Sequence, residues 1–320
     1  HRDLHLSIRR QRQMCIRDSE TGRPTVMLMA GVALLIVGLG FKAALVPFHM
    51  WTPDVYEGAP TSVTAYMSAA AKIGAFAAIL RVFNSLVPIA PYWMIAIQVL
   101  AVFTMFGGNI LAIMQDNIKR MLAYSSIAHA GYLLVAVVSA TGGKPDTYQT
   151  AFGAMTFYLF AYTLMTMGSF GVLILLSKRG RDIQTMNDLK GLARTDPFAA
   201  YAMLIFMLSL GGIPPAMGFI GKWFIFNSAL NAGQLGLAIA LALASIILIY
   251  YYLRVISMMC SCWSRAVFFA SRRKRPAISS SSSTPSTERM SFTAIGRCMV
   301  KSVPRYTTPM PPCPIVASRR

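Results

Sequence analysis

The sequence predicts an all-α polytopic membrane protein with about seven transmembrane helices, two of them broken. Hydrophobic residues make up 55% of the 320 residues, and the mean hydropathy is +0.54. Apolar runs of about 17–25 residues, the length that crosses a bilayer as a helix, recur along the chain. Prolines interrupt two of these runs, and lysines lie inside three of them.

The spans follow from apolar runs separated by short connections that contain Pro, Gly, Asn or Asp. In chain order, the predicted spans are residues 25–46, 61–83, 91–114, 120–140, 149–177, 200–226 and 233–256. The longer polar connection has a weak amphipathic stripe, which predicts a short helix on the membrane surface over about residues 178–197. Eight basic residues flank the spans on one side and three on the other, which places the first side in the cytoplasm.

We predict broken helices at Pro47 in the first span and at Pro214 and Pro215 in the sixth. Proline removes a backbone donor, and the carbonyls left unpaired are tolerated at membrane depth only inside protein or beside a wet cavity. Paired broken helices indicate an ion path in inverted-repeat transporters. A simple structural kink is the alternative at each break, and a lysine near each one favours the ion path.

Those lysines, Lys42 and Lys222, and a third at Lys72 lie in apolar stretches that contain no acid. A charged side chain at the bilayer centre costs about 2.5 kcal/mol or more, so such residues usually face the bundle interior and mark ion or proton routes. The alternative is snorkelling to the headgroups. It suits Lys72 poorly, because about ten residues, roughly 15 Å of helix, lie on either side.

His129, in the middle of the fourth span, is a possible relay because its imidazole titrates near neutral pH. An interhelical hydrogen bond explains a buried histidine equally well. These four residues, Lys42, Lys72, Lys222 and His129, are the candidate proton carriers.

The net charge of +19 does not predict a nucleic-acid partner, because most of the excess lies outside the apolar part. Residues 254–320 hold twelve Lys and Arg against one acid, whereas residues 24–253 hold twelve against seven. All five cysteines also lie outside 24–253, without a Cys-x-x-Cys pair or a glycine-rich dinucleotide motif. The sequence therefore predicts no metal site, no cofactor and no redox centre in this chain.

Composition divides the chain into three parts. Residues 1–23 are rich in Arg and Gln and are expected to be non-native or disordered; residues 24–258 form a partial transmembrane domain. Residues 259–320 become rich in Ser, Arg and Pro, with a serine homopolymer at Ser279–Ser283. This change predicts an out-of-frame or disordered basic tail.

Residues 40–60, GFKAALVPFHMWTPDVYEGAP, strongly resemble the antiporter-like membrane subunits of respiratory complex I, the proton-pumping NADH:quinone oxidoreductase. Residues 117–127, 212–222 and 250–255 agree with the same family. The resemblance covers about residues 24–258. It implies a fourteen-helix inverted-repeat fold, of which the seven spans would be helices seven to thirteen.

The resemblance also implies roles. Lys42 would be the coupled switch on a broken helix, Lys72 the relay and Lys222 the exit-side carrier, while the glutamate that pairs with Lys42 would lie upstream of this chain. FMN, iron–sulfur clusters and quinone would bind in partner subunits. The implied setting is a multi-pass protein of the bacterial inner membrane, in contact with lipid and with other membrane subunits of complex I.

Three other functions compete with this one. A multisubunit cation/proton antiporter or a membrane-bound hydrogenase shares the architecture, but such relatives often carry His where Lys72 stands. A structural spacer would gain nothing from the desolvation cost of embedded cations. Nucleic-acid binding through the basic tail requires that tail to be translated in frame.

Overall fold

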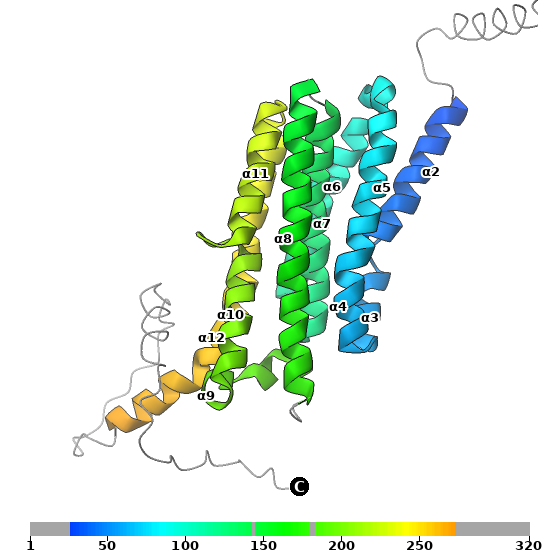
Figure 1. Cartoon of the computed structure of the whole chain (residues 1–320). Coiled ribbons are helices and arrows are strands. Elements are labelled where there is room, and N and C mark those ends of the chain that lie inside the picture. The colour runs from blue at the N-terminus through cyan, green and yellow to red at the C-terminus, as the bar shows by residue number, and fades with distance from the viewer. Residues whose placement is uncertain (1–25, 143–144, 179–182, 273–320) are drawn as a thin grey trace, which may run out of the picture. The chain divides into compact units, whose positions relative to one another are not determined.

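A computed structural model describes residues 26–142, 145–178 and 183–272 (Figure 1). The expected non-native segment 1–23 and most of the expected tail, from 273 onward, lie outside these residues. The chain divides into two compact units, His1–Trp263 and Ser264–Arg320, and the account below concerns the first.

All named elements of the described residues are helices, which confirms the predicted fold class. In chain order they are α2 (Val26–Ala43), α3 (Trp51–Gly58), α4 (Thr61–Tyr66), the π-helix η1 (Met67–Ala71), α5 (Lys72–Ser85), the 3₁₀-helix η2 (Val87–Ile89), α6 (Ala90–Ile113), α7 (Ile118–Gly142), α8 (Pro145–Lys178), the 3₁₀-helix η3 (Met186–Leu189), α9 (Leu192–Thr195), α10 (Pro197–Gly211), α11 (Met217–Asn231) and α12 (Leu235–Arg272).

Six helical segments of the described chain are long and apolar enough to cross a membrane. They are Val26–Ala43, Thr61–Ser85, Val87–Ile113, Ile118–Gly142, Thr147–Lys178 and Leu235–Cys260. The remaining predicted span, 200–226, the sixth in chain order, is a pair of shorter helices, α10 and α11. The chain between them contains Pro214 and Pro215, so the predicted break is confirmed.

The other predicted break is present at Pro47, between the end of α2 and the start of α3. The chain leaves α2 through Ala44, which has a φ of 59°, a left-handed conformation that few non-glycine residues adopt. The α2 end of the break thus has a strained backbone, which the bundle must stabilise through packing.

The centre of the bundle is α7, which is almost wholly buried. A helix that is apolar on every side is expected to be buried inside a bundle. Helices α3, α5, α6, α8 and α11 pack against it. Two glycines bring α6 and α7 close together: a Cβ on Gly108 would lie 2.7 Å from the Ala128 nitrogen, and one on Gly131 would lie 2.5 Å from the Met105 side chain.

Polar residues gather at the end of the bundle where α7 begins. Residues 114–117, here called the α6–α7 turn, join α6 to α7. Asn117 Oδ1 accepts from the Lys119 and Arg120 amides and so caps α7. Arg254 of α12 donates to Asp116 at 2.9 Å. By the distribution of basic residues, this is the predicted cytoplasmic end.

The polar connection between α8 and α10 differs from the single short helix expected over 178–197. Its described part contains two short pieces, η3 and α9, and it pairs with the α6–α7 turn through backbone hydrogen bonds such as Met186 N to Asp116 O at 2.9 Å. Asp188 closes a capping box with Thr185, whose backbone N–H holds the pKa of that carboxyl below its usual value. These local bonds favour short turns over one continuous helix.

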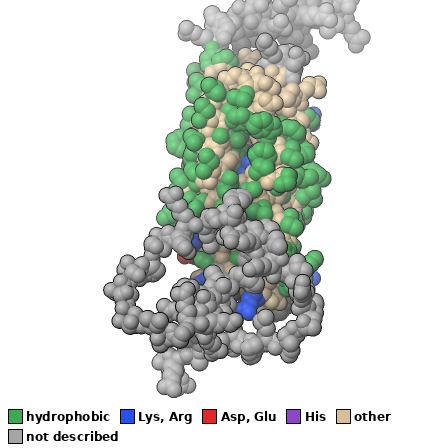
Figure 2. Space-filling view, turned by 90° about the vertical axis from the view of Figure 1, so that its left-hand side faces the viewer, with side chains coloured by type: hydrophobic (Ala, Val, Ile, Leu, Met, Phe, Trp, Pro, Cys, Tyr) green, Lys and Arg blue, Asp and Glu red, His purple; other side chains and the backbone are tan. Residues whose placement is uncertain are grey.

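Large hydrophobic side chains cover the outside of the helices, including Leu34, Phe103, Phe160 and Ile246. Figure 2 shows them along most of the height of one face. A soluble protein rarely exposes so much apolar surface, and a lipid-facing surface requires it.

Candidate proton-carrying site

Lys72 is the first residue of α5, directly after the π-helix η1, and its side chain is 3% exposed. Its ammonium donates to the Ser126 carbonyl of α7 and lies 5.5 Å from the centre of the Tyr162 ring. The prediction that this lysine faces the bundle interior is therefore confirmed, and snorkelling is excluded for it. A carbonyl and a ring face offset part of the cost of a buried cation.

Lys222 of α11 is 6% exposed and explains how the second break is stabilised. Its ammonium donates to the carbonyls of Leu210 at 3.2 Å and Gly211 at 3.0 Å. These carbonyls end α10 and have no partner in the next helical turn, because the helix stops there. A cation is favoured at this end of a helix, so the break and the lysine stabilise each other.

His129 of α7 lies between the two lysines. Its Nδ1 is hydrogen-bonded to the Tyr158 hydroxyl, and its Nε2 lies 3.4 Å from the Tyr252 hydroxyl. Tyr252 in turn is hydrogen-bonded to Ser125. Both ring nitrogens thus meet phenols from different helices, α8 and α12.

Two further tyrosines connect His129 to the lysines. The His129 ring is 5.2 Å from the Tyr162 ring, which lies under Lys72, and 5.6 Å from the Tyr132 ring. Lys222 lies 5.4 Å from the centre of the Tyr132 ring. We call this set, Lys72, Tyr162, His129, Tyr132 and Lys222, the lysine–tyrosine chain.

Sequence reasoning found the lysines and the histidine of this chain but not its tyrosines. Tyr162 of the chain and Tyr158, the partner of His129, are one helical turn apart on α8, a spacing that places them on one face. This spacing is visible in the sequence, but buried tyrosines commonly serve only in packing. Their contacts with His129 and Lys72 are known only from the structure.

Lys42 is not part of the lysine–tyrosine chain. It lies in the last turn of α2 and is exposed, because α2 lies at the edge of the bundle, with α5 and α6 as its main helical neighbours. The sequence expectation of a lysine turned to the interior is thus met at Lys72 and Lys222 but not at Lys42 in this chain. The role of Lys42 as a coupled switch stays a prediction.

The described residues show no carboxylate within the lysine–tyrosine chain. No Asp or Glu is among the buried polar side chains of the described residues. No group of three His, Cys, Asp or Glu among the described residues is placed to hold a metal ion. The groups available for chemistry are therefore amines, one imidazole and phenols. All of them can accept or donate protons through nitrogen or oxygen.

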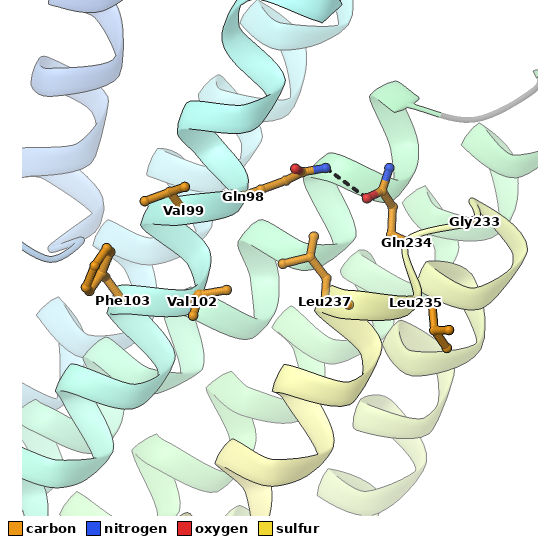
Figure 3. A pocket seen from close by; sticks show the side chains of 9 residues that line it. Gln98, Val99, Val102, Phe103, Gly233, Gln234, Leu235 and Leu237 are labelled. Atoms are coloured by element: carbon orange, nitrogen blue, oxygen red, sulfur yellow. Dashed lines mark hydrogen bonds between the residues drawn. The ribbon is translucent and has the colours of Figure 1, made fainter.

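A separate pocket of about 460 Å³ lies between the middle of α6 and the start of α12 (Figure 3). Gln98 donates to Gln234 at 2.8 Å on one side of it, and Val99, Val102 and Leu237 line the rest. It contains no titratable side chain, so it is not part of the proton-carrying site.

Comparison with known proteins identifies the family. A family model described as "NADH:quinone oxidoreductase/Mrp antiporter, TM" matches residues 6–248, more than half of the chain. The chain belongs to this family. The match begins within the segment 1–23, where we expected non-native sequence.

Individual members agree with the family assignment. The chain is 49% identical over 240 residues to NADH-quinone oxidoreductase subunit N 1 of Herpetosiphon aurantiacus, covering 75% of this chain and 47% of that protein. It is 48% identical over 239 residues to NADH-quinone oxidoreductase subunit N of Trichlorobacter lovleyi, covering 74% and 48%. The chain thus spans about half the length of the curated relatives it matches.

Solved structures of the family have the same fold. Respiratory complex I from Thermus thermophilus contains a chain 38% identical to this one, with a TM-score of 0.60, over 74% of this chain and 50% of that chain. The Mrp complex from Dietzia contains a chain 28% identical, with a TM-score of 0.64, over 71% and 41%. These relatives confirm the all-α polytopic membrane fold predicted from the sequence.

Proposed function

We propose that this protein is a proton-translocating membrane subunit of a bacterial NADH:quinone oxidoreductase, working beside other membrane subunits of complex I in the inner membrane. Quinone reduction, with FMN and the iron–sulfur clusters, would take place in partner subunits. The single observation that carries the proposal is the lysine–tyrosine chain, in which two buried lysines lie on either side of a buried histidine. Membership of the family supports the same conclusion.

In the proposed mechanism, the proton moves from Lys72 through His129 to Lys222. An imidazole can take up a proton at one ring nitrogen and release the one on the other nitrogen, provided both nitrogens have partners. Those partners are the hydroxyls of Tyr158 and Tyr252. Charges in a bundle interior are poorly screened, so a proton arriving at one lysine disfavours charge at the other and promotes its release.

Lys42 would set the direction of transfer as the coupled switch on the first break, and Lys222 would release the proton on the exit side. This assignment rests on the resemblance of residues 40–60 to the complex I subunits. The position of the Lys222 ammonium against the last carbonyls of α10, next to the second break, supports its part of the assignment.

A cation/proton antiporter subunit is the second candidate, and the likeness to a chain of the Mrp complex favours it. Identities of 48–49% to NADH-quinone oxidoreductase subunits, against 28% to the Mrp chain, favour complex I. Proton uptake into vesicles that requires NADH oxidation and not a Na⁺ gradient would distinguish the two.

The test is Lys72→Met, introduced at the matching position of a full-length relative in its assembled complex. Methionine fills a similar volume but carries no proton, so we expect NADH-driven proton uptake into membrane vesicles to fall by about fivefold or more. Lys178→Met is the matched control, because Lys178 is an exposed lysine in the last turn of α8. Uptake equal to the unmodified complex in the Lys72 variant would refute the proposal.

A further inference from the structure

Asn109 of α6 is a fully buried amide that links three helices. Its Nδ2 donates to the Ala244 carbonyl of α12 at 2.9 Å and to the Tyr132 hydroxyl of α7 at 3.4 Å. Its Oδ1 accepts from the Tyr251 hydroxyl of α12 at 3.2 Å. Because a backbone carbonyl can only accept, the nitrogen must face Ala244, so the network fixes which way the amide points.

A buried asparagine in a membrane bundle can serve only to join helices. Each interhelical hydrogen bond contributes little, however, and Gly108, directly before Asn109, already allows α6 and α7 to pack closely. An apolar side chain at this position would avoid the cost of burying an amide. What distinguishes Asn109 is the identity of its partners, because Tyr132 belongs to the lysine–tyrosine chain.

Through Tyr132, Asn109 acts on the surroundings of Lys222. A phenol offers an ammonium two acceptors, the hydroxyl oxygen and the ring face, and a hydrogen bond to the oxygen is the stronger contact. In the structure, the Lys222 Nζ lies 5.4 Å from the centre of the Tyr132 ring, while the hydroxyl takes the hydrogen bond from Asn109. The ammonium donates instead to the carbonyls of Leu210 and Gly211. The ring face of Tyr132 is thus turned to the lysine, and its hydroxyl is held by α6.

Through Tyr251, Asn109 also reaches His129. The rings of Tyr251 and Tyr252 pack together, with their centres 4.7 Å apart. The Tyr252 hydroxyl lies 3.4 Å from the His129 Nε2. One buried amide is therefore connected, by one tyrosine in the first case and two in the second, to both Lys222 and His129.

We propose that Asn109 is a positioning residue of the proton-carrying site, which holds the Tyr132 hydroxyl away from Lys222 so that the ammonium meets only the ring face and can release its proton. A hydrogen bond from the ammonium to the phenol oxygen would stabilise the charged lysine and keep the proton there. No proton passes through Asn109 in this role, because its amide only orients a neighbour. This inference rests on the proposed function.

The test measures NADH-driven proton uptake in Asn109→Leu, in Tyr132→Phe and in the double variant, each in a full-length relative within its assembled complex. Leucine fills a similar volume but cannot donate, so the freed Tyr132 hydroxyl should bind Lys222. Uptake should then fall by about fivefold or more while the amount of assembled complex is unchanged.

Phenylalanine keeps the ring and removes the hydroxyl, so Tyr132→Phe should keep at least about half of the uptake. In the double variant no hydroxyl is left to bind Lys222, so uptake should return to the level of Tyr132→Phe alone. A residue that only holds helices together would not be rescued in this way. The matched control is Asn84→Leu, at an exposed position of α5, which should leave uptake unchanged.

Normal uptake in Asn109→Leu would overturn the positioning role. A double variant no better than Asn109→Leu would also overturn it, because Asn109 would then act through packing or through Tyr251. Tyr132→Phe gives a separate reading, since it keeps the Asn109 side chain: a fivefold loss there would show that the hydroxyl itself is needed. Lys72→Met, measured alongside, keeps the two proposals apart, because only normal uptake in that variant would refute the proposed function.

Discussion

At the residue scale, the second break depends on a contact between one glycine and one lysine. Gly212 follows α10 with a φ of 78°, a conformation that glycine adopts freely and other residues do not. A Cβ at this position would lie 2.8 Å from the Lys222 ammonium nitrogen. The missing side chain of Gly212 thus allows both the left-handed backbone that ends α10 and the space that the Lys222 ammonium fills.

Gly212→Ala should therefore lower stability and displace Lys222. The left-handed conformation alone costs an alanine about 1–2 kcal/mol, and the contact with Lys222 adds to it. Thermal unfolding in detergent micelles measures the loss. The neighbouring substitution Gly211→Ala is the control, since its Cβ would have no neighbour closer than 3.8 Å. Equal unfolding temperatures for the two variants would contradict this account.

At the element scale, the bundle depends on the close approach of α6 and α7. Because a Cβ on Gly108 would lie 2.7 Å from the backbone of α7, small residues at this contact determine the distance between the helices. Flexible side chains can move aside, but a neighbouring backbone cannot move without shifting a whole helix.

Gly108→Ala should destabilise the protein by about 1–3 kcal/mol, the usual cost of overpacking a core. Gly153→Ala on α8 is the control, since nothing lies within 4 Å of its Cβ position, and alanine there should gain up to about 1 kcal/mol of helix propensity. Unfolding followed by circular dichroism in micelles reports both. The opposite order of stabilities would be inconsistent with close packing between α6 and α7.

The sequence predicted elements whose signal is local. Long apolar runs identified the spans, and prolines identified both breaks, because hydropathy and the missing proline N–H act at the positions of the residues themselves. Asp54 and Glu57, just after the first break, lie in α3. Pro53 is only the third residue of that helix, where its missing N–H has no intrahelical partner to lose, so proline was compatible with a helix start.

Non-local features could not be predicted in this way. The π-helix before Lys72 widens one turn without any marker residue in MSAAA. The tyrosines of the lysine–tyrosine chain acquire their role from contacts among α5, α7, α8 and α11. The exposure of Lys42 depends on which helices pack against α2. A single sequence contains none of these long-range contacts explicitly.

At the scale of the whole described bundle, the α6–α7 turn holds together segments that are far apart in sequence. Asn117 donates to Glu57 of α3 at 2.8 Å. Arg254 of α12 donates to Asp116 and, at 3.0 Å, to the Ile113 carbonyl at the end of α6. Elements on both sides of the second break, α3 and α6 before it and α12 after it, therefore meet at one turn.

Arg254→Met should destabilise this junction more than Asp116→Asn does. The arginine change leaves helix-terminal carbonyls unpaired, at about 1–3 kcal/mol, whereas the asparagine change weakens a largely exposed ion pair worth about 0–1 kcal/mol. The difference in unfolding temperature between the two variants, measured at low and at high salt, tests this. Equal losses that both vanish at high salt would show that the ion pair alone matters.

The near-complete enclosure of α7 has a consequence for its surroundings. A helix with neighbours on every side presents no surface to fatty-acyl chains, whereas α2 and α6 present many large side chains to them. Photoreactive probes dissolved in the hydrocarbon phase will therefore label those outer helices and spare α7. His129, the proton carrier proposed on α7, is in this way shielded from the oily medium that the protein crosses.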